Sequence, residues 1–358
     1  MAAPKIQQLL DNTISQAASD LHLSVGKPPI IRIDGSLVPL STYGDLDEQS
    51  MNTLLTSIMN EEQKQLYQTN KEIDFSFEYA QKSRFRVNAY TQLGRPAAAL
   101  RLIPMAIPRL EDLNLPGVCQ GFSELRQGLV LVTGPTGHGK STTLAAILSE
   151  INHSRPEHII SIEDPIEYVH SPAKSLFSQR EMHNDTLSWK VALASVLRED
   201  PDVVLIGEMR DFETIASALT IAETGHLVFA TLHTNSAAQT IDRIVDVFPP
   251  HQQDQIRVQL AATLAGVFSQ RLLPAIGGGR ALAYEILLAN PAIQNTIREG
   301  KSHMIDNILM TSADVGMSIF ENSLAQLVND GVVAPDIAIQ YAVRPDELSR
   351  MIYGNKKK

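Results

Sequence analysis

The sequence predicts an α/β protein, with a mostly parallel, helix-covered sheet between a small α+β domain and a mainly helical subdomain. Four short apolar runs with helical patterns between them predict the sheet, because strands buried on both faces are apolar almost throughout. These runs are Leu129–Val132, Ile159–Ile162, Val203–Ile206 and Leu227–Phe229. The second observation is a glycine-rich segment between the first run and a helix-compatible stretch.

At about 100–200 residues per domain, the length predicts two or three domains. We expect an N-terminal α+β domain at 1–103, a linker at 104–117, an α/β core at 118–249 and a mainly helical subdomain at 250–358. Prolines 104, 108 and 116 stiffen the linker, which predicts a hinge of limited reach.

Composition excludes several classes of protein. Apolar residues make up 44% of the 358 residues and charged residues 20%, which excludes a disordered chain, a collagen-like fibre and a disulfide scaffold. The net charge of −10 argues against extensive binding to a nucleic-acid backbone. A single cysteine, Cys119, excludes an intrachain disulfide and favours a reducing cytoplasm. Residues 1–10 do not resemble a secretory signal, and no apolar run is long enough to span a bilayer.

The N-terminal domain is predicted to contain two helices and five strands. Apolar spacing of three and four residues predicts the helices, and alternation bounded by Gly and Pro predicts the strands. The helices are expected at 6–14 and 51–58, and the strands at 21–25, 31–33, 73–77, 85–90 and 97–103.

The core alternates strands with helices, of which Ile215, Leu219 and Ala222 mark one. After Pro249 the pattern is largely helical, apart from a possible strand at 281–288. Lys356–Lys358 is expected to be a solvated tail.

The glycine-rich segment matches the phosphate-binding loop pattern G-x-x-x-x-G-K-[ST]. Its residues are Gly134, Pro135, Thr136, Gly137, His138, Gly139, Lys140, Ser141 and Thr142. Glycines let main-chain amides approach phosphate oxygens, and the following helix adds positive partial charge. We expect Lys140 to reach the β- and γ-phosphates and Ser141 to bind Mg²⁺. A chance match in a chain of this length has a probability on the order of one per cent.

Two carboxylates follow predicted strands, where an α/β sheet places its ligands. Glu163 ends the strand at 159–162, and Glu208 follows Val203–Ile206 in a segment that resembles a Walker B strand. Each has a simpler interpretation: Glu163 caps a turn before Pro165, and Glu208 pairs with Arg210. ATP hydrolysis requires carboxylates that hold the metal ion and orient the attacking water. Because the chain also contains a phosphate-binding loop, we favour these functional roles for Glu163 and Glu208.

Two histidines, His226 and His233, flank the strand at 227–232. Their spacing places them on opposite faces, which is poor geometry for a shared metal ion. The nucleotide is expected to be ATP, because the nearest match to a guanine-specific Asn-Lys-x-Asp signature, Asn70–Asp74, is one residue too long and lies in the wrong domain.

Four ordered motifs resemble the type IV pilus retraction ATPases, the twitching motility PilT family of secretion-type motors. They are the phosphate loop, an Asp box at His158–His170, a Walker B region at Leu197–Asp211, and a His box from Glu223–His226 through Thr231–Thr234 to Asp242–Arg243. Segments Ala18–Ser24 and Arg84–Asn88 are also similar to the N-terminal domain of this family.

The resemblance implies a RecA-like P-loop ATPase core, a PAS-like N-terminal domain and a homohexameric ring in which nucleotide sits between the two domains. It implies that Glu163 is the general base, that Glu208 supports Mg²⁺, and that His226 and His233 sense the γ-phosphate and the subunit boundary. Arginines reach the phosphates across an interface in this family. The best matches are Arg84 and Arg101, with Arg243 a weaker candidate.

The implied function is an ATP-hydrolysing motor for pilus retraction and twitching motility, located in the cytoplasm at the inner-membrane pilus base. Its implied partners are the inner-membrane platform protein and other pilus ATPases, without nucleic acid. Two positions depart from the family: His138 replaces a usual Ser and Gln294 a usual Arg. We expect the first to leave hydrolysis intact, while the second leaves an accessory retraction paralogue open.

Three other functions stay as alternatives. Extension and type II secretion ATPases commonly carry a four-cysteine zinc insertion and an extra N-terminal domain, against which the single cysteine and the short N-terminal region argue. A nucleic-acid translocase would need a basic surface. A non-catalytic nucleotide sensor would not need Glu163 and Glu208.

Overall fold

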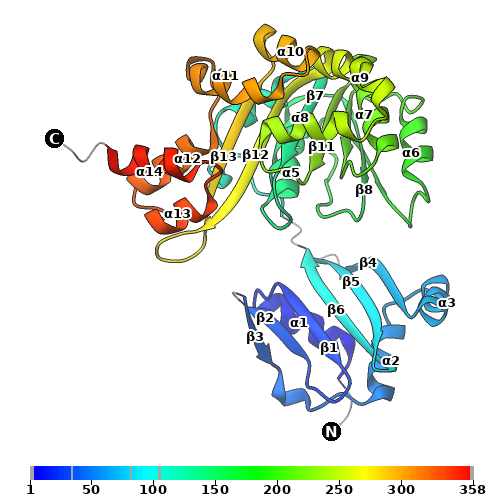
Figure 1. The fold of residues 1–358 in the computed structure, drawn as a ribbon. Coiled ribbons are helices and arrows are strands. Elements are labelled where there is room, and N and C mark those ends of the chain that lie inside the picture. Colours follow the sequence, from blue (N-terminus) through cyan, green and yellow to red (C-terminus); the bar gives the residue numbers. More distant parts are fainter. Residues whose placement is uncertain (1–3, 34, 81–82, 104–105, 355–358) are drawn as a thin grey trace. The chain divides into compact units, whose positions relative to one another are not determined.

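The computed structural model describes residues 4–33, 35–80, 83–103 and 106–354, which form two compact units, Met1–Ala106 and Ile107–Lys358 (Figure 1). The first two residues of the expected linker, 104 and 105, and the expected solvated tail lie outside the described residues.

The N-terminal unit is one antiparallel sheet with three helices. Its strand order is β3-β2-β1-β6-β5-β4. The strands are β1 (Asp20–Ser24), β2 (Ile30–Ile33), β3 (Ser36–Pro39), β4 (Glu72–Tyr79), β5 (Ser83–Gln92) and β6 (Arg95–Ile103), and the helices are α1 (Ile6–Ser15), α2 (Glu48–Thr56) and α3 (Glu61–Asn70). Every expected element is present. The structure also contains two elements that were not predicted, the exposed edge strand β3 and the polar helix α3. Neither has the periodic apolar residues from which a strand or helix is predicted.

Alternation along β5 explains which face of this sheet is covered. Phe85, Val87 and Ala89 are completely buried in the core that α1 and α2 share, whereas Arg84 and Arg86 are turned to the other face. The face opposite α1 and α2 therefore carries the polar side chains of β5.

The second unit contains a seven-stranded sheet in the order β13-β12-β7-β11-β10-β8-β9. All neighbouring strands are parallel except β12 and β13. The strands are β7 (Gly128–Thr133), β8 (His158–Glu163), β9 (Leu176–Glu181), β10 (Val203–Ile206), β11 (Leu227–Leu232), β12 (Leu264–Pro274) and β13 (Arg280–Leu288). The predicted α/β class with a mostly parallel sheet is confirmed.

Helices cover both faces of this sheet, which explains the continuous apolar runs (Figure 1). The helices are α4 (Val118–Glu124), α5 (Lys140–Ser154), α6 (Trp189–Val196), α7 (Phe212–Glu223), α8 (Ala237–Asp246), α9 (Pro250–Thr263), α10 (Pro291–Arg298), α11 (Ile305–Thr311), α12 (Phe320–Asn329), α13 (Pro335–Tyr341) and α14 (Pro345–Tyr353). Alternate β7 residues enter two cores: Leu129 and Leu131 pack with α7 to α9, and Val130 and Val132 with α4 and α5.

The expectation of a mainly helical subdomain from residue 250 needs a correction. Helices α9 to α14 are present, but β12 and β13 lie among them and complete the sheet beside β7. The expected strand at 281–288 is β13, whereas β12 was missed. The physical reason is that Ser269, Gln270 and Arg271 interrupt the apolar residues of β12, so the segment shows neither a continuous apolar run nor an alternation. It also follows α9 directly, so it resembles a continuation of the helix.

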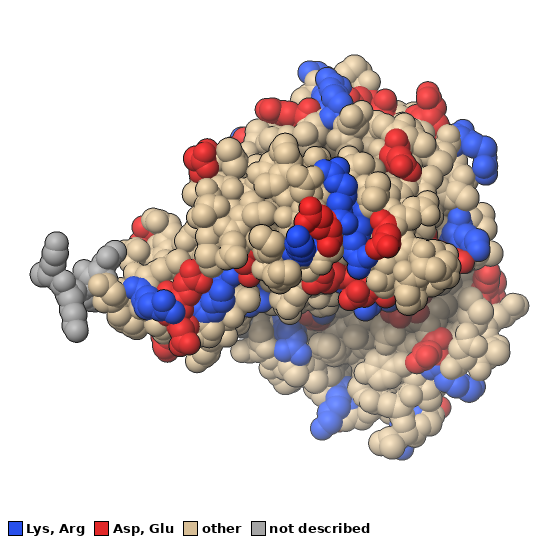
Figure 2. Space-filling view, turned by 45° about the horizontal axis from the view of Figure 1, so that its top comes forward, with Lys and Arg blue, Asp and Glu red and all other residues tan. Residues whose placement is uncertain are grey.

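The described residues contain no helix that is both long enough and apolar enough to cross a bilayer. Figure 2 shows the charged residues of one face, where Lys and Arg are interspersed with Asp and Glu and do not gather into one basic area.

Candidate nucleotide-binding site

The glycine-rich loop connects β7 to the first turn of α5, in the strand–loop–helix context that the motif requires. Gly137 and Gly139 have φ angles of 79° and 84°, in the left-handed region that favours glycine. A Cβ atom on Gly134 would overlap the main-chain oxygen of Gln270 in β12. The loop therefore needs these glycines for both its turns and its close approach to the neighbouring strand.

Lys140 is folded over the loop. Its Nζ donates to the main-chain oxygens of Gly134 at 2.8 Å and Pro135 at 3.0 Å, and only 8% of the residue is exposed. Burial lowers the pKa of Lys140, and the nearby carboxylates of Glu208 and Glu167 oppose that shift. A cation that is already partly stripped of water interacts strongly with a phosphate.

Glu163 lies at the carboxyl end of β8 and is half-buried. Ser161 Oγ donates to its Oε1 at 2.7 Å and Gln179 Nε2 to the same oxygen at 3.3 Å. Burial raises the pKa of Glu163 to about 7, against the lowering effect of these hydrogen bonds. A carboxylate with a pKa near neutrality is suited to accept a proton.

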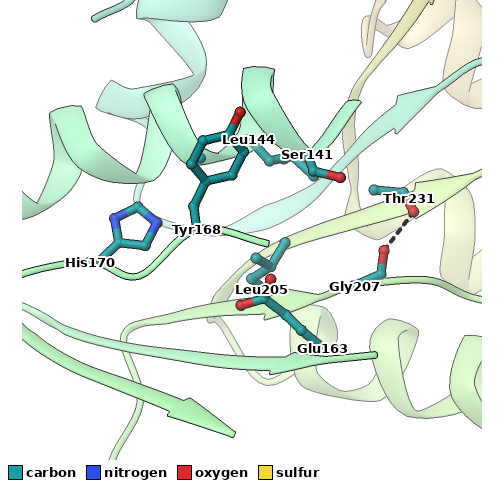
Figure 3. Close-up of a pocket in the computed structure, with 9 residues that line it drawn as sticks. Ser141, Leu144, Glu163, Tyr168, His170, Leu205, Gly207 and Thr231 are labelled. Carbon is teal, nitrogen blue, oxygen red and sulfur yellow. Dashed lines mark hydrogen bonds between the residues drawn. The ribbon is translucent and has the colours of Figure 1, made fainter. Parts of the chain in front are cut away.

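A small cavity of about 30 Å³ lies between Glu163 and the first turn of α5 (Figure 3). Its lining includes Ser141 from α5, Glu163 from β8, Thr231 from β11, and Tyr168 and His170 from the segment after β8. Volume on this scale holds a water molecule. The cavity thus brings together the start of α5 and the Glu163 carboxyl group.

Glu208 follows β10 and lies beside the side chains of Arg210 and His233. Its Oε1 lies 3.1 Å from His233 Nε2, and its Oε2 lies 2.8 Å from the Arg210 guanidinium. Burial opposes ionisation, but Arg210 and His233 outweigh it and hold the pKa of Glu208 below its ordinary value. The pairing with Arg210, which was the simpler interpretation, is therefore present and keeps this carboxylate charged.

His233 connects the loop to Glu208. Its Nδ1 lies 3.2 Å from Thr136 Oγ1 and 3.5 Å from Lys140 Nζ, while its Nε2 faces Glu208. Since Thr136 and Lys140 both belong to the loop, a change at the loop reaches Glu208 through a single side chain.

His226 is not part of this cluster. It directly precedes β11, whereas His233 directly follows it, so the two histidines lie at opposite ends of this strand. The Nδ1 of His226 contacts Thr224 Oγ1 at 3.0 Å and the Ile221 oxygen at 3.1 Å. The implied contact of His226 with the γ-phosphate is wrong for the loop of its own chain, because six strand residues of about 3.3 Å each separate the two histidines.

Two of the candidate arginines, Arg84 and Arg101, belong to the N-terminal unit. Arg101 in β6 is directly opposite Arg86 in β5, and its Nε donates to Asp20 at 3.0 Å. Arg84 shares this face of the N-terminal sheet and donates to Ser76 Oγ at 2.6 Å. Arg86 was not singled out, although alternation within Arg84–Asn88 places it on the same face. Arg243 is exposed in the last turn of α8.

Two glutamines were also missed in the sequence. Gln179 in β9 contacts Glu163, and its Nε2 donates to the Tyr168 oxygen at 2.8 Å. Gln270 in β12 accepts from Thr143 Oγ1 at 2.9 Å. Both lie within strands that the apolar pattern did not predict, β9 and β12, so no signal in the sequence pointed to them.

Ser141 and Glu208 fit a role in holding Mg²⁺. The hydroxyl of Ser141 lines the cavity, and the Glu208 carboxylate is kept ionised by its neighbours. Among the described ranges, no cluster of three or more His, Cys, Asp or Glu side chains is suited to a metal ion by itself. A Mg²⁺ ion that binds together with a nucleotide takes most of its ligands from phosphate oxygens and waters.

The chain matches the family of type II/IV secretion system proteins over residues 2–332. It is 49% identical to the twitching motility protein of Neisseria gonorrhoeae, over 90% of this chain and 86% of that protein. It is 48% identical to the type IV pilus retraction ATPase PilT of Pseudomonas aeruginosa, over 95% of this chain and 99% of that protein.

Among solved structures, the pilus retraction motor PilT with bound ADP superimposes with a TM-score of 0.91 at 46% identity, over 97% of this chain and 99% of that one. Similarity of sequence and structure over nearly the full length, together with an intact phosphate loop and its two acids, places the chain in the type II/IV secretion system protein family.

Proposed function

We propose that this chain is the ATP-hydrolysing motor of type IV pilus retraction, the activity that drives pilus disassembly and twitching motility. The observation that carries the proposal is its near full-length similarity to retraction ATPases, combined with a site in which the loop, Glu163 and Glu208 meet. Hydrolysis needs a phosphate cradle, a base and a charged carboxylate for the metal ion, and each has a residue here.

The proposed chemistry is attack of water on the γ-phosphorus of ATP. Glu163 accepts the proton of the attacking water as the new P–O bond forms, and the bond to the β–γ bridging oxygen breaks, with ADP as the leaving group. Lys140 and the loop amides stabilise the charge that develops on the phosphates. Mg²⁺, held through Ser141 and supported by Glu208, supplies further charge stabilisation when bound.

His233 is proposed to report the state of the γ-phosphate. It contacts the loop at Thr136 and Glu208 at its other nitrogen, so loss of the phosphate changes both contacts. Arg84 and Arg101 are proposed to act on the site of a neighbouring subunit in a homohexamer, which would couple hydrolysis to the position of that neighbour. The partner of the ring is proposed to be the inner-membrane platform protein at the pilus base, reached from the cytoplasm.

The test compares Lys140→Ala, Glu163→Gln and a control, Lys301→Ala, whose side chain is 53% exposed in an ion pair with Glu299. We expect Lys140→Ala to abolish MgADP binding. Glu163→Gln should keep binding but reduce phosphate release by about a hundred-fold or more, the usual contribution of a general base. Wild-type turnover by Glu163→Gln would contradict the assignment of the base.

In cells, deletion of the gene should leave excess pili and abolish twitching, and only the wild type and Lys301→Ala should restore it. Gln294 favours one second candidate, an accessory retraction paralogue, because the family usually has Arg at this half-buried position of α10. Normal twitching after deletion would support that accessory role over the main motor.

A further inference from the structure

Within the described part of the chain, the outer half of β12 has no strand partner on the side of the phosphate loop. Pairing between β12 and β7 ends at Ser269 and Thr133, where β7 turns into the loop. Beyond that point β12 continues to Pro274, paired only with β13 on its other side. Main-chain groups on this edge need other hydrogen-bond partners.

The side chain of His138 in the loop supplies one such partner, and two further hydrogen bonds join the loop to β12 and β13. Its Nδ1 accepts the main-chain N–H of Leu272 at 2.9 Å, and its main-chain oxygen accepts from Gln270 Nε2 at 2.7 Å. Arg280 in β13 donates to the neighbouring main-chain oxygen of Gly137 at 3.2 Å. The tip of the loop is therefore bonded to the β12–β13 hairpin at Gly137 and at His138.

The contact with Leu272 determines the tautomer of His138. A main-chain N–H can only donate, so Nδ1 must be unprotonated and the ring proton must lie on Nε2. Protonation of Nδ1 would break this hydrogen bond, because the His138 Nδ1–H and the Leu272 N–H would then both be donors and would face each other. The contact exists only while the imidazole is neutral.

The surroundings of His138 favour that neutral form. Burial lowers its pKa, and Arg271 from β12, Lys140 from α5 and Arg280 from β13 all lower it further because they are positive. The ring is half-buried. At neutral pH the acceptor is thus maintained by position and charge together.

We propose that His138 is a positioning residue for nucleotide binding, whose Nδ1 holds the phosphate loop on β12 in the conformation that receives phosphate. This inference rests on the nucleotide-binding function proposed above and assigns to the side chain a role that the loop motif does not require. A serine could not take it over, because its hydroxyl lies one bond nearer the main chain than Nδ1.

A matched pair of variants isolates the acceptor. Asn places an oxygen near the position of Nδ1, and Leu has nearly the same shape without an acceptor. We expect His138→Leu to weaken MgADP binding by about five- to ten-fold, the factor for one hydrogen bond of ordinary strength. His138→Asn should restore the wild-type Kd to within about two-fold. The control is His251→Asn, an exposed histidine in α9.

Turnover separates positioning from catalysis. His138→Leu should raise KM for ATP by a similar factor and change kcat by less than about two-fold, because Glu163 and Glu208 keep their partners. The wild type should also lose MgADP affinity as the pH falls from 7.5 to 5.5, relative to His138→Asn measured in the same buffers. This difference cancels protonation of the nucleotide itself.

Independent support comes from the ¹⁵N NMR shifts of the His138 ring in the intact wild-type protein, which should show Nε2–H at pH 7.5. Equal Kd values for the Leu and Asn variants would overturn the inference. So would an affinity that rises at low pH in the wild type alone, since that would mean direct contact of a charged ring with phosphate. Failure of the wild type to bind MgADP would instead overturn the proposed nucleotide binding, and this inference with it.

Discussion

Two acids of the candidate site have opposite electrostatic environments. Burial dominates at Glu163 and raises its pKa to about 7, whereas Arg210 and His233 hold the pKa of Glu208 low. A pair of carboxylates whose pKa values are pushed apart is suited to two roles, one accepting a proton and one remaining charged for the metal ion. Both residues are glutamates, so the difference in their pKa values comes from their surroundings and not from the residue type.

Removal of Ser161 Oγ should therefore change the pH profile. This hydroxyl donates to the charged form of Glu163, so Ser161→Ala should raise the pKa of the base further. A base works deprotonated, so turnover is present above its pKa and is lost as the pH falls through it. We expect the acid limb of kcat, near pH 7 in the wild type, to move to higher pH in the variant.

Steady-state kcat measured from pH 5.5 to 9 checks this, with Ser217→Ala on the exposed side of α7 as the control. A limb that stays at the wild-type pH in Ser161→Ala would argue that Glu163 is not the titrating base.

Between elements, a buried ionic cluster joins the C-terminal helices to the sheet. Arg344, just before α14, contacts Glu321 in α12 at 2.9 Å and Asp306 in α11 at 2.6 Å. It also lies 3.9 Å from Glu285 in β13, whose Oε1 accepts the main-chain N–H of Ala237 at the start of α8. With Glu347 in α14 at 3.4 Å, one guanidinium thus compensates carboxylates from four elements, and two of these carboxylates, Glu285 and Glu321, are almost fully buried.

Arg344→Met should destabilise the fold by about 3–5 kcal/mol at pH 8, because breaking a buried pair leaves charges without compensation. This loss of stability should be smaller at lower pH. Burial raises the pKa of Glu285 in the folded state to about 7, above its value in the unfolded chain, so below pH 7 the folded state binds a proton at Glu285. A protonated Glu285 carries no charge and no longer needs Arg344 to compensate it. Urea unfolding at pH 8 and pH 6 measures both effects.

The comparison variant is Arg109→Met, which removes an exposed guanidinium paired with Asp112 and should barely change stability. Equal losses in the two variants would show that the cluster around Arg344 contributes no more than a surface pair.

At the scale of the whole molecule, the sequence predicted what is encoded locally. The loop motif identified Lys140 and Ser141, and continuous apolar runs located the four central strands. It missed β12 because Ser269, Gln270 and Arg271 interrupt its apolar residues, so the segment shows neither a continuous apolar run nor an alternation. It also left His138 without a role, because the partner of its side chain is 134 residues away and known only once the sheet is assembled. Contacts of Gln179 and Gln270 were hidden for the same reason.

The last prediction concerns the assembled ring. If Arg84 and Arg101 act on a neighbour, each working site combines the Glu163 of one chain with the arginines of another. An Arg84→Gln/Arg101→Gln variant and a Glu163→Gln variant should each be inactive. An equimolar mixture of the two should recover up to about a quarter of wild-type phosphate release. That is the share of head-to-tail interfaces in which one subunit supplies an intact Glu163 and its neighbour supplies both arginines. Glu163→Gln mixed with Lys140→Ala should recover nothing, because loop and base belong to the same site of one chain. Mixed rings, verified by native mass spectrometry, that stayed inactive in the first mixture would place the arginines in their own chain's site and remove the physical basis for coupling between subunits.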